Sequence, residues 1–440
     1  MASGMFWALL GSVISRGSIM LAGVLVARCL GKAGYGKWGL LLSAGAIFAA
    51  FAGFGLGSAA TNNIAALKVL DRKKAARILS LVLILGVGMI VLMSVAMVLC
   101  SDWMARYLYE KPELSNPLKI SVAILATSIF GQMLQSILAG FQDFRGIAVS
   151  TVAQGVTFLV VGTVLTWSMG LWGTVLGMAV AWAVACVVCW LYIMRECRHY
   201  GMHVAVRGVW RERAIVWKYS MPIILTSAVS GPAGMLSLAL VARLPSGLAA
   251  LGGYNAASTW GGAVLFVPSA FRRVTLPMLA KLKGERDPRR FMKALWGNIA
   301  ANVGVALIVA APIMILSSWI MGFYGADFVR DWDILVLVAA MAVLQAANDV
   351  VGQVTTCMEK LWWNSAIYVL WSVILLGGSF LLVPHLGVRG YLWAMFAATC
   401  SHLAFFSIAA FVFIKRSDFS PVTPSPSPEE VIDEPGGRRM

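Results

Sequence analysis

Long apolar runs follow one another along the whole chain and are separated by short polar links. Each run has about 20 residues with few charges, which is the length that an α-helix needs to cross the hydrocarbon core of a bilayer. We predict about twelve such helices, six in each half of the chain. They are expected at about 5–27, 38–60, 78–100, 118–140, 149–168, 171–193, 219–242, 249–270, 294–318, 333–355, 362–383 and 390–413.

The composition supports a membrane protein and excludes a water-soluble one. Hydrophobic residues make up 60% of the 440 residues and charged residues only 12%, and the mean hydropathy is +0.82. A soluble domain carries about a quarter charged residues, so this chain could not cover its own surface in water. The sequence therefore predicts an all-α polytopic membrane protein whose surroundings are membrane lipids.

The net charge of +16 indicates topology and not binding to nucleic acid, because the basic residues gather in the short links. If both termini are cytoplasmic, the cytoplasmic links hold 23 Lys and Arg and the outer links hold 8. Cytoplasmic links of membrane proteins carry such an excess. The first apolar run lacks a basic leader and is interrupted by Arg16, so we expect a retained helix and not a signal peptide.

The second half of the chain repeats the first at an offset of about 216 residues. Leu-Val-Ala-Arg ends at Arg28 and again at Arg243, and a Gly-x-x-Gly pattern begins at Gly170 and again at Gly387. Six helices per repeat is an even number, so both halves enter the membrane in the same direction. We therefore predict two parallel six-helix bundles around a central cleft, as in transporters built from parallel repeats.

This repeat divides the chain into four parts. The first bundle is expected at 1–195, a basic cytoplasmic linker at 196–218, and the second bundle at 219–416. The remaining residues, 417–440, are rich in Pro and Ser, and a segment of that composition cannot form a packed core. We expect a disordered cytoplasmic tail there.

Two short segments of the first repeat resemble a known family. Val26–Gly36 (VARCLGKAGYG) and Phe54–Gly57 (FGLG) are similar to the N-terminal signature of the polysaccharide transporter family. Its members are O-antigen and exopolysaccharide repeat-unit flippases of the multidrug/oligosaccharidyl-lipid/polysaccharide exporter superfamily. The resemblance covers about residues 5–415, and the family's two-bundle plan agrees with the repeat.

The resemblance implies a function in polysaccharide biosynthesis. The substrate would be an undecaprenyl-diphosphate-linked oligosaccharide that moves from the cytoplasmic to the outer leaflet of the bacterial inner membrane. Polysaccharide polymerases and glycosyltransferases would be partners in the same process. The resemblance does not identify the sugar.

Three arginines are candidate substrate-binding residues. Arg16 lies near the middle of the first run, where a charge costs about 2.5–3.5 kcal/mol even on insertion scales. In the cleft its guanidinium would suit an anionic diphosphate, whereas a structural bond to backbone carbonyls is the alternative. Arg28 and Arg243 occupy equivalent helix ends, either as anchors at the membrane interface or as a symmetric pair at the outer mouth. Lys119 is expected to be an interfacial anchor.

Several polar residues within the apolar runs have two possible roles. Gln132, Gln135 and Asn255 are candidates for a hydrophilic cavity, together with Gln154 and Gln345, but such side chains also tie membrane helices together. Asp349 is the acidic residue deepest in a run and is a candidate for ion coupling or for pairing with an arginine.

Pro222 and Pro232 fall in one predicted helix and make it the best candidate for a bending gate. Cys186 and Cys189 form a CxxC, but no second pair accompanies them, and we expect a packing role. We expect no metal and no cofactor, and the absence of a GxxxxGK[ST] motif argues against direct use of ATP.

Other functions agree less well with the sequence. A cation-coupled multidrug exporter should carry acidic residues inside its bundles, and the first six predicted helices have none. A lipid II flippase is closer, although such proteins often carry fourteen helices. A membrane enzyme such as a sugar polymerase would need a large outer loop for its catalytic groups, and the longest outer link here has about 17 residues.

Overall fold

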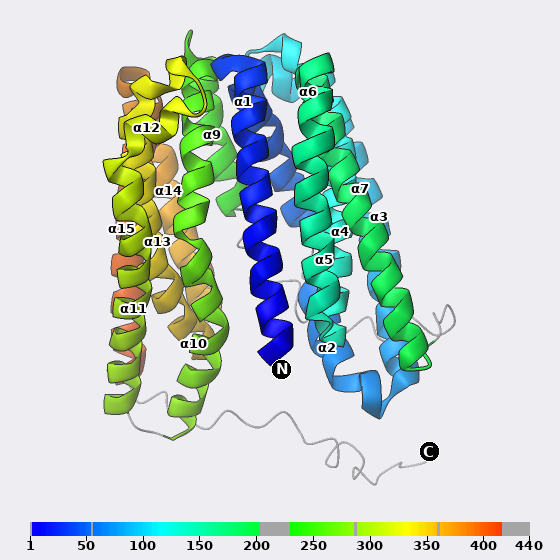
Figure 1. Ribbon diagram of the computed structural model, residues 1–440. Helices are drawn as coiled ribbons and strands as arrows, with labels where there is room; N and C mark the ends of the chain where they lie inside the picture. The colour runs from blue at the N-terminus through cyan, green and yellow to red at the C-terminus, as the bar shows by residue number, and fades with distance from the viewer. Residues whose placement is uncertain (1, 54–55, 203–228, 286–287, 359–360, 416–440) are drawn as a thin grey trace, which may run out of the picture.

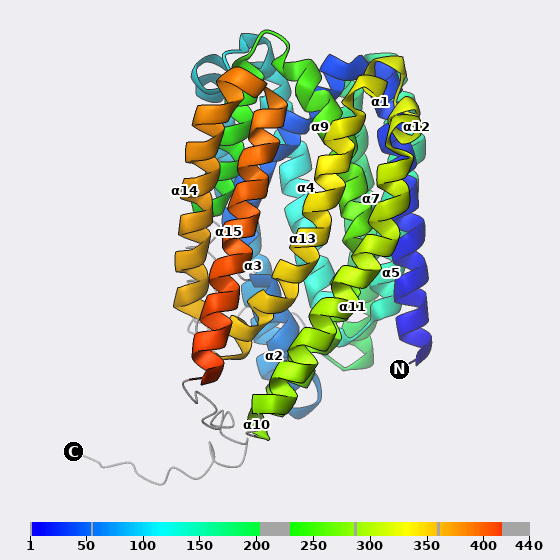
Figure 2. The ribbon, with the colours of Figure 1, turned by 90° about the vertical axis from the view of Figure 1, so that its left-hand side faces the viewer.

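The computed structural model describes residues 2–53, 56–202, 229–285, 288–358 and 361–415. Helices make up nearly all of these residues, and no strand occurs among them. The helices form two bundles that stand side by side, with the first half of α1 between them in the view of Figure 1. Figure 2 shows the second bundle in front, with its long helices aligned along a common direction.

The first bundle contains seven α-helices. They are α1 (Ala2–Gly53), α2 (Leu56–Leu70), α3 (Arg72–Trp103), α4 (Ser115–Phe141), α5 (Phe144–Thr157), α6 (Thr163–Met169) and α7 (Leu171–His199). A five-residue π-helix extends α3 over Met104–Leu108, and a second one joins α5 to α6 over Phe158–Gly162. A 3₁₀ turn over Pro112–Leu114 precedes α4.

The second bundle begins, within the described residues, with a helix over Val229–Arg243. It continues with α9 (Gly247–Val264), α10 (Phe266–Gly284), α11 (Pro288–Ile315), α12 (Ser317–Gly322), α13 (Trp332–Cys357), α14 (Leu361–Leu386) and α15 (Val388–Lys415). A 3₁₀ helix over Ala326–Asp331 links α12 to α13.

The expected spans are present, with different boundaries. In the described part of the chain, nine helices are long and apolar enough to cross a membrane. The first two expected spans both lie within α1, which consists of two helices that meet at a kink at Gly31, where the φ of 69° is not helical. The expected span at 249–270 is instead divided at Leu265 between α9 and α10. The seventh span is described only from Val229 onward, and α7 ends at His199, beyond the expected bundle boundary at 195.

Large apolar side chains cover the outside of the bundles. Trp167 is 83% exposed and Ile315 is 82% exposed, and similar residues follow the outer faces of most helices. A contiguous apolar surface of this kind is unfavourable in water. It suits the hydrocarbon of a bilayer, where backbone groups must be paired inside helices, as they are here.

The internal repeat is visible in equivalent contacts. Lys68 donates through Nζ to the carbonyl oxygen of Phe141 at 2.8 Å, and Lys283 donates to that of Cys357 at 3.1 Å. Gly170 and Gly387 both have a φ of 59°. Each pair is separated by 215 to 217 residues, so both bundles use the same construction. The prediction of two repeated bundles is confirmed.

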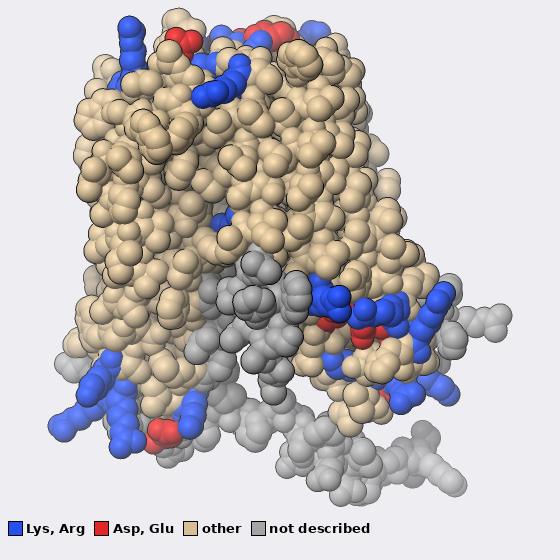
Figure 3. Space-filling model, viewed as in Figure 1, with Lys and Arg blue, Asp and Glu red and all other residues tan. Residues whose placement is uncertain are grey.

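We call the end of the bundles that carries Arg28, Leu108, Arg243 and Phe323 the sealed end. The opposite end, which carries the N-terminal start of α1 and the end of α15, is called the basic end. The space-filling view in Figure 3 shows that Lys and Arg gather at the two ends, with a surface of other residues, drawn in tan, between them. A small blue patch lies in a hollow about midway along this face.

The expected tail at 417–440 lies outside the described residues, as do Pro222 and most of the expected linker.

Candidate functional site

A cavity of about 590 Å³ lies between the two bundles, and Arg16 is one of its lining residues. The α1 segment from Val13 to Met20 forms one wall, and α9 and the start of α10 form the other. Arg16 is the only charged residue among the described residues that line it. These are Val13, Ser15, Arg16, Gly17, Ile19, Met20, Thr259, Gly262, Ala263 and Phe266.

The guanidinium of Arg16 contacts the second bundle. Its Nη1 donates to the carbonyl oxygen of Gly262 at 3.0 Å, and its Cζ lies 4.6 Å from the centroid of the Phe266 ring. A guanidinium has five N–H donors, so this one bond leaves most of them available to a ligand in the cavity. The geometry combines the two interpretations of Arg16: it faces the cavity, and it also bonds a backbone carbonyl.

Arg28 and Arg243 form reciprocal contacts between the bundles at the sealed end. Arg28, in the first bundle, donates through Nε to the carbonyl oxygen of Phe323 in the second, at 2.6 Å. Arg243, in the second bundle, donates through Nε to Leu108 at 2.9 Å and through Nη2 to Tyr107 at 2.8 Å, both in the first. The donors are 215 residues apart, and so are the acceptors Leu108 and Phe323. The repeat therefore creates a two-fold related pair of arginine contacts.

Further contacts close the sealed end around this pair. Lys32 on α1 forms an ion pair with Asp331 at 2.8 Å. The ring of Tyr35 lies 6.2 Å from that of Tyr324 and 6.4 Å from that of Phe328, so aromatic rings of both bundles meet. Lys32 and Tyr35 lie in the family-like segment Val26–Gly36, but the sequence patterns did not indicate their contacts with the second bundle, because spacing along the chain gives no sign of contact across the repeat.

Two glycines let α1 and α9 approach closely beside these rings. A Cβ on Gly36 would lie 1.8 Å from the carbonyl oxygen of Leu248, and one on Gly252 would lie 2.0 Å from that of Lys32. Small residues allow such backbone contact between membrane helices. Arg16 lies 12 residues before Arg28 in α1, which is about 18 Å of helix toward the basic end. These contacts between α1 and the second bundle therefore lie between the Arg16 cavity and the surface of the sealed end.

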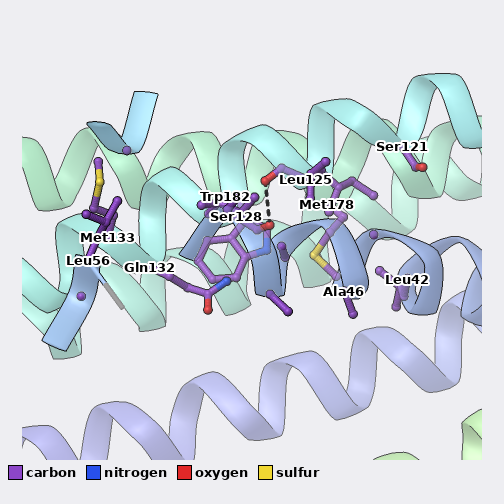
Figure 4. Close-up of a pocket in the computed structure, with 18 of the residues that line it drawn as sticks. Leu42, Ala46, Leu56, Ser121, Leu125, Ser128, Gln132, Met133, Met178 and Trp182 are labelled. Atoms are coloured by element: carbon purple, nitrogen blue, oxygen red, sulfur yellow. Dashed lines mark hydrogen bonds between the residues drawn. The ribbon is translucent and has the colours of Figure 1, made fainter. Parts of the chain in front are cut away.

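The polar candidates Asn255, Gln135 and Gln132 have different surroundings. Asn255 donates through Nδ2 to the carbonyl oxygen of Tyr35 at 3.2 Å and so joins α9 to α1. The amide nitrogen of Gln135 is buried, and no hydrogen-bond partner for it is found among the described residues. Gln132 lines a second cavity, also of about 590 Å³, inside the first bundle. Figure 4 shows its side chain extending beside Trp182.

Asp349 is half-buried in α13 and accepts a hydrogen bond from Nε2 of Gln345 at 2.9 Å. The expected pairing with an arginine is not among the ion pairs of the described residues. The neighbouring Asn348 donates to the carbonyl oxygen of Thr399 and contacts His402, so a polar cluster lies inside the second bundle.

The remaining candidates have simple surroundings. Pro232 lies in the described part of the helix Val229–Arg243. Lys119 forms an ion pair with Asp102 at 2.9 Å. Cys186 and Cys189 are free thiols on α7 and are packed among apolar side chains. Among the described residues, no group of three or more His, Cys, Asp and Glu could hold a metal ion.

The sequence profile of the family described as "Polysaccharide biosynthesis protein" matches residues 1–283. The chain is also 23% identical over 407 residues to the EPS I polysaccharide export inner membrane protein EpsE of Ralstonia solanacearum, with 90% of each chain covered. This match extends over both bundles.

Solved structures with the same fold include two kinds of transporter. An inward-facing multidrug resistance MATE family transporter of the MOP superfamily superposes with a TM-score of 0.74 at 14% identity, covering 93% of this chain and 98% of the other. The lipid II flippase MurJ in an inward closed conformation gives 0.66 at 15% identity, covering 93% and 90%. At sequence identities of 14% and 15%, these similarities show a shared fold and nothing beyond it. The chain is therefore a multi-pass membrane protein with the MOP-superfamily transporter fold, and it belongs to the polysaccharide biosynthesis protein family.

Proposed function

We propose that this protein is a flippase for an undecaprenyl-diphosphate-linked oligosaccharide. It would move this lipid from the cytoplasmic to the outer leaflet of the bacterial inner membrane by alternating access between the two bundles. The basic end would face the cytoplasm, in agreement with the excess of Lys and Arg in its links. The family match and the polysaccharide export protein of Ralstonia support this class of substrate.

One observation carries the proposal: Arg16 lines the cavity between the bundles, and none of the other described residues of its lining is charged. A cation at mid-depth in a membrane protein must face protein or water, because its cost in lipid is high. An anionic diphosphate entering this cavity would meet the free donors of the guanidinium, whose planar fork matches phosphate oxygens. A cationic drug would meet repulsion there, so the structure favours a flippase over a multidrug exporter.

Alternating access then requires the sealed end to open after the substrate has entered. The contacts that must break include those of Arg28 and Arg243 with backbone carbonyls of the opposite bundle. We assign these two arginines to the outer mouth, where they can also meet the departing diphosphate. Asp349 is the proposed ion-coupling residue, and Pro222 and Pro232 are the proposed bending points. Gln132, Gln135 and Asn255 would line the substrate path.

Surface display of polysaccharide tests the role of Arg16. In a strain that lacks its own flippase, export should decrease in the order parent, Arg16→Lys, Arg16→Ala, because Lys keeps the charge but loses the fork. The amount of protein in the membrane is measured by immunoblot in each strain. Parental export by Arg16→Ala would refute the assignment. Loss of the protein from the membrane would show that Arg16 is structural.

A further inference from the structure

The cavity of the first bundle is lined by residues of α1, α2, α3, α4 and α7 and shares no described lining residue with the one that Arg16 lines. Figure 4 shows α4 along one side of it, with Ser121, Leu125, Ser128 and Gln132 on the face toward the cavity. None of the described residues in its lining is charged. Glycine, alanine and leucine predominate, and the polar groups come mainly from α4.

These polar groups form a stripe along one face of α4. Ser121, Ser128, Gln132 and Ser136 all line the cavity. Their spacings of seven, four and four residues keep them on one side of a helix with 3.6 residues per turn. Polar stripes on membrane helices commonly join neighbouring helices. Here the stripe faces a cavity of about 590 Å³ instead, so its hydrogen-bonding capacity is directed toward a bound molecule.

The stripe can both donate and accept hydrogen bonds. The three serine hydroxyls donate to carbonyl oxygens of α4 itself, at 2.8 Å for Ser121, 3.2 Å for Ser128 and 2.9 Å for Ser136. Each hydroxyl oxygen keeps its acceptor capacity. The Gln132 side chain is exposed to the cavity, and its amide has no hydrogen-bond partner among the described residues. It can therefore donate and accept.

Trp182 on α7 supplies a flat apolar surface beside this stripe. A Cβ on Gly131 would lie 2.8 Å from Cε3 of Trp182, so the indole lies directly against the backbone of α4. Gly131 thus holds the ring at the level of Gln132, as Figure 4 shows for the two labelled side chains. An aromatic face beside amide and hydroxyl groups suits a ligand that has both C–H faces and hydroxyl edges.

We propose that this cavity binds the saccharide part of the transported lipid, and specifically an uncharged sugar residue. A sugar ring would place its C–H face on Trp182 and its hydroxyls against Gln132 and the serine oxygens. This inference rests on the proposed flippase function and adds a second subsite: the diphosphate meets Arg16, and the sugar enters the first bundle. The described part of the lining is uncharged and offers no charged partner to a carboxylate on that sugar.

Binding of two related lipids to the purified full-length protein in nanodiscs tests this subsite. The probes are the undecaprenyl-diphosphate-linked oligosaccharide, extracted from the host strain with this gene deleted, and undecaprenyl diphosphate without sugar. The variants are Gln132→Ala and Trp182→Ala. The matched control is Trp167→Ala, which removes an 83% exposed indole from the outer face of α6.

We expect Gln132→Ala and Trp182→Ala each to weaken binding of the glycosylated lipid about fivefold to tenfold, the size of one lost hydrogen bond or aromatic contact. Their affinity for undecaprenyl diphosphate should equal that of the parent, and the control should match the parent with both probes. Equal weakening for both probes would show that the cavity holds the lipid chain. Unchanged affinity for both would show a structural role only. Either result overturns the saccharide subsite.

Failure of the flippase proposal itself gives a different result in the same experiment. The parent protein would then bind neither probe more tightly than empty nanodiscs do. Loss of folding in a variant is detected by its elution in size-exclusion chromatography. Gly131→Ala provides a second route to the site, because it displaces the Trp182 ring without removing it. It should also weaken binding of the glycosylated lipid alone.

Discussion

Replacing both Arg28 and Arg243 by alanine should shift the protein toward the form in which the sealed end is open. Arg28 donates one hydrogen bond to the opposite bundle, at 2.6 Å, and Arg243 donates two, at 2.8 and 2.9 Å. Arg243 also pairs with Glu110 at 3.4 Å, but the side chains are 38% and 56% exposed. An exposed pair of this kind adds little.

Charged hydrogen bonds contribute about 1.5–3 kcal/mol when buried. These side chains are exposed, so we take about 1 kcal/mol for each arginine, as for a neutral bond. The variant Arg28→Ala/Arg243→Ala then loses about 2 kcal/mol of the free energy that favours the sealed state, which is about a 30-fold change in the equilibrium between sealed and open forms. Each single variant should show about a fivefold change on the same scale. Because the two contacts are related by the repeat, the two single variants should behave alike.

Electron–electron distance measurements between spin labels can detect this change. Met169 ends α6, and Arg330 lies in the 3₁₀ helix that links α12 to α13, so labels at Met169→Cys and Arg330→Cys report on the two bundles at the sealed end. The seven native cysteines are first replaced by serine. The parent should show mainly the shorter distance, and the double variant should gain a longer one. Arg106→Ala is the control, because this nearby arginine donates to no carbonyl of the second bundle among the described residues. A double variant with the parent's distance distribution would refute the gate.

Four other predictions follow from particular residues. Reporter fusions after Arg213 and after Lys415 should both report cytoplasm, and a periplasmic signal from either would refute the topology. Gly31→Ala should lower the free energy of unfolding by about 1–3 kcal/mol, since its φ of 69° suits only glycine and no atom lies within 4 Å of the new Cβ; a melting temperature equal to the parent's would contradict this. Gly252→Ala should shift the spin-label distances toward the open form, whereas Gly304→Ala, with open space around its Cβ, should not; equal effects would show that α1 and α9 separate easily. Asp349→Asn should reduce export of polysaccharide at unchanged membrane levels, and normal export would remove Asp349 from the coupling proposal.

The fold was largely predictable from the sequence, because it depends on patterns that are local or repeated. Apolar length predicts spanning helices, and the shared Leu-Val-Ala-Arg segments predict two equivalent bundles. The helix boundaries were less predictable. Two helices meet directly at the kink at Gly31, where the sequence predicted a link of several residues. The break at Leu265 lies three residues before Pro268, which has no N–H to donate to the carbonyl oxygen of Val264. A proline can also lie within a continuous, kinked span, so its presence did not locate the break.

The site was predictable only in part, because it depends on contacts between the repeats. The depth of Arg16 in an apolar run indicated that it must face protein or water. The sequence could not show that its guanidinium would contact the ring of Phe266 and the carbonyl oxygen of Gly262. The equivalence of Arg28 and Arg243 was visible as a repeat, but their acceptors are backbone carbonyls, which carry no sequence signal. The polar stripe on α4 has a helical period that is visible in the sequence. Only the cavity beside it in the structure distinguishes a ligand site from a contact between helices.

Transport by the reconstituted protein tests the central claim most directly. Proteoliposomes are prepared with the undecaprenyl-diphosphate-linked oligosaccharide in both leaflets, and a membrane-impermeant glycosidase removes the sugars that it can reach from outside. With the parent protein, nearly all of the oligosaccharide should become cleavable over time, and with Arg16→Ala the cleavable fraction should stay near one half. If the parent also leaves one half protected, as protein-free liposomes do, while it remains folded in the membrane, the protein does not flip this lipid and the account is wrong.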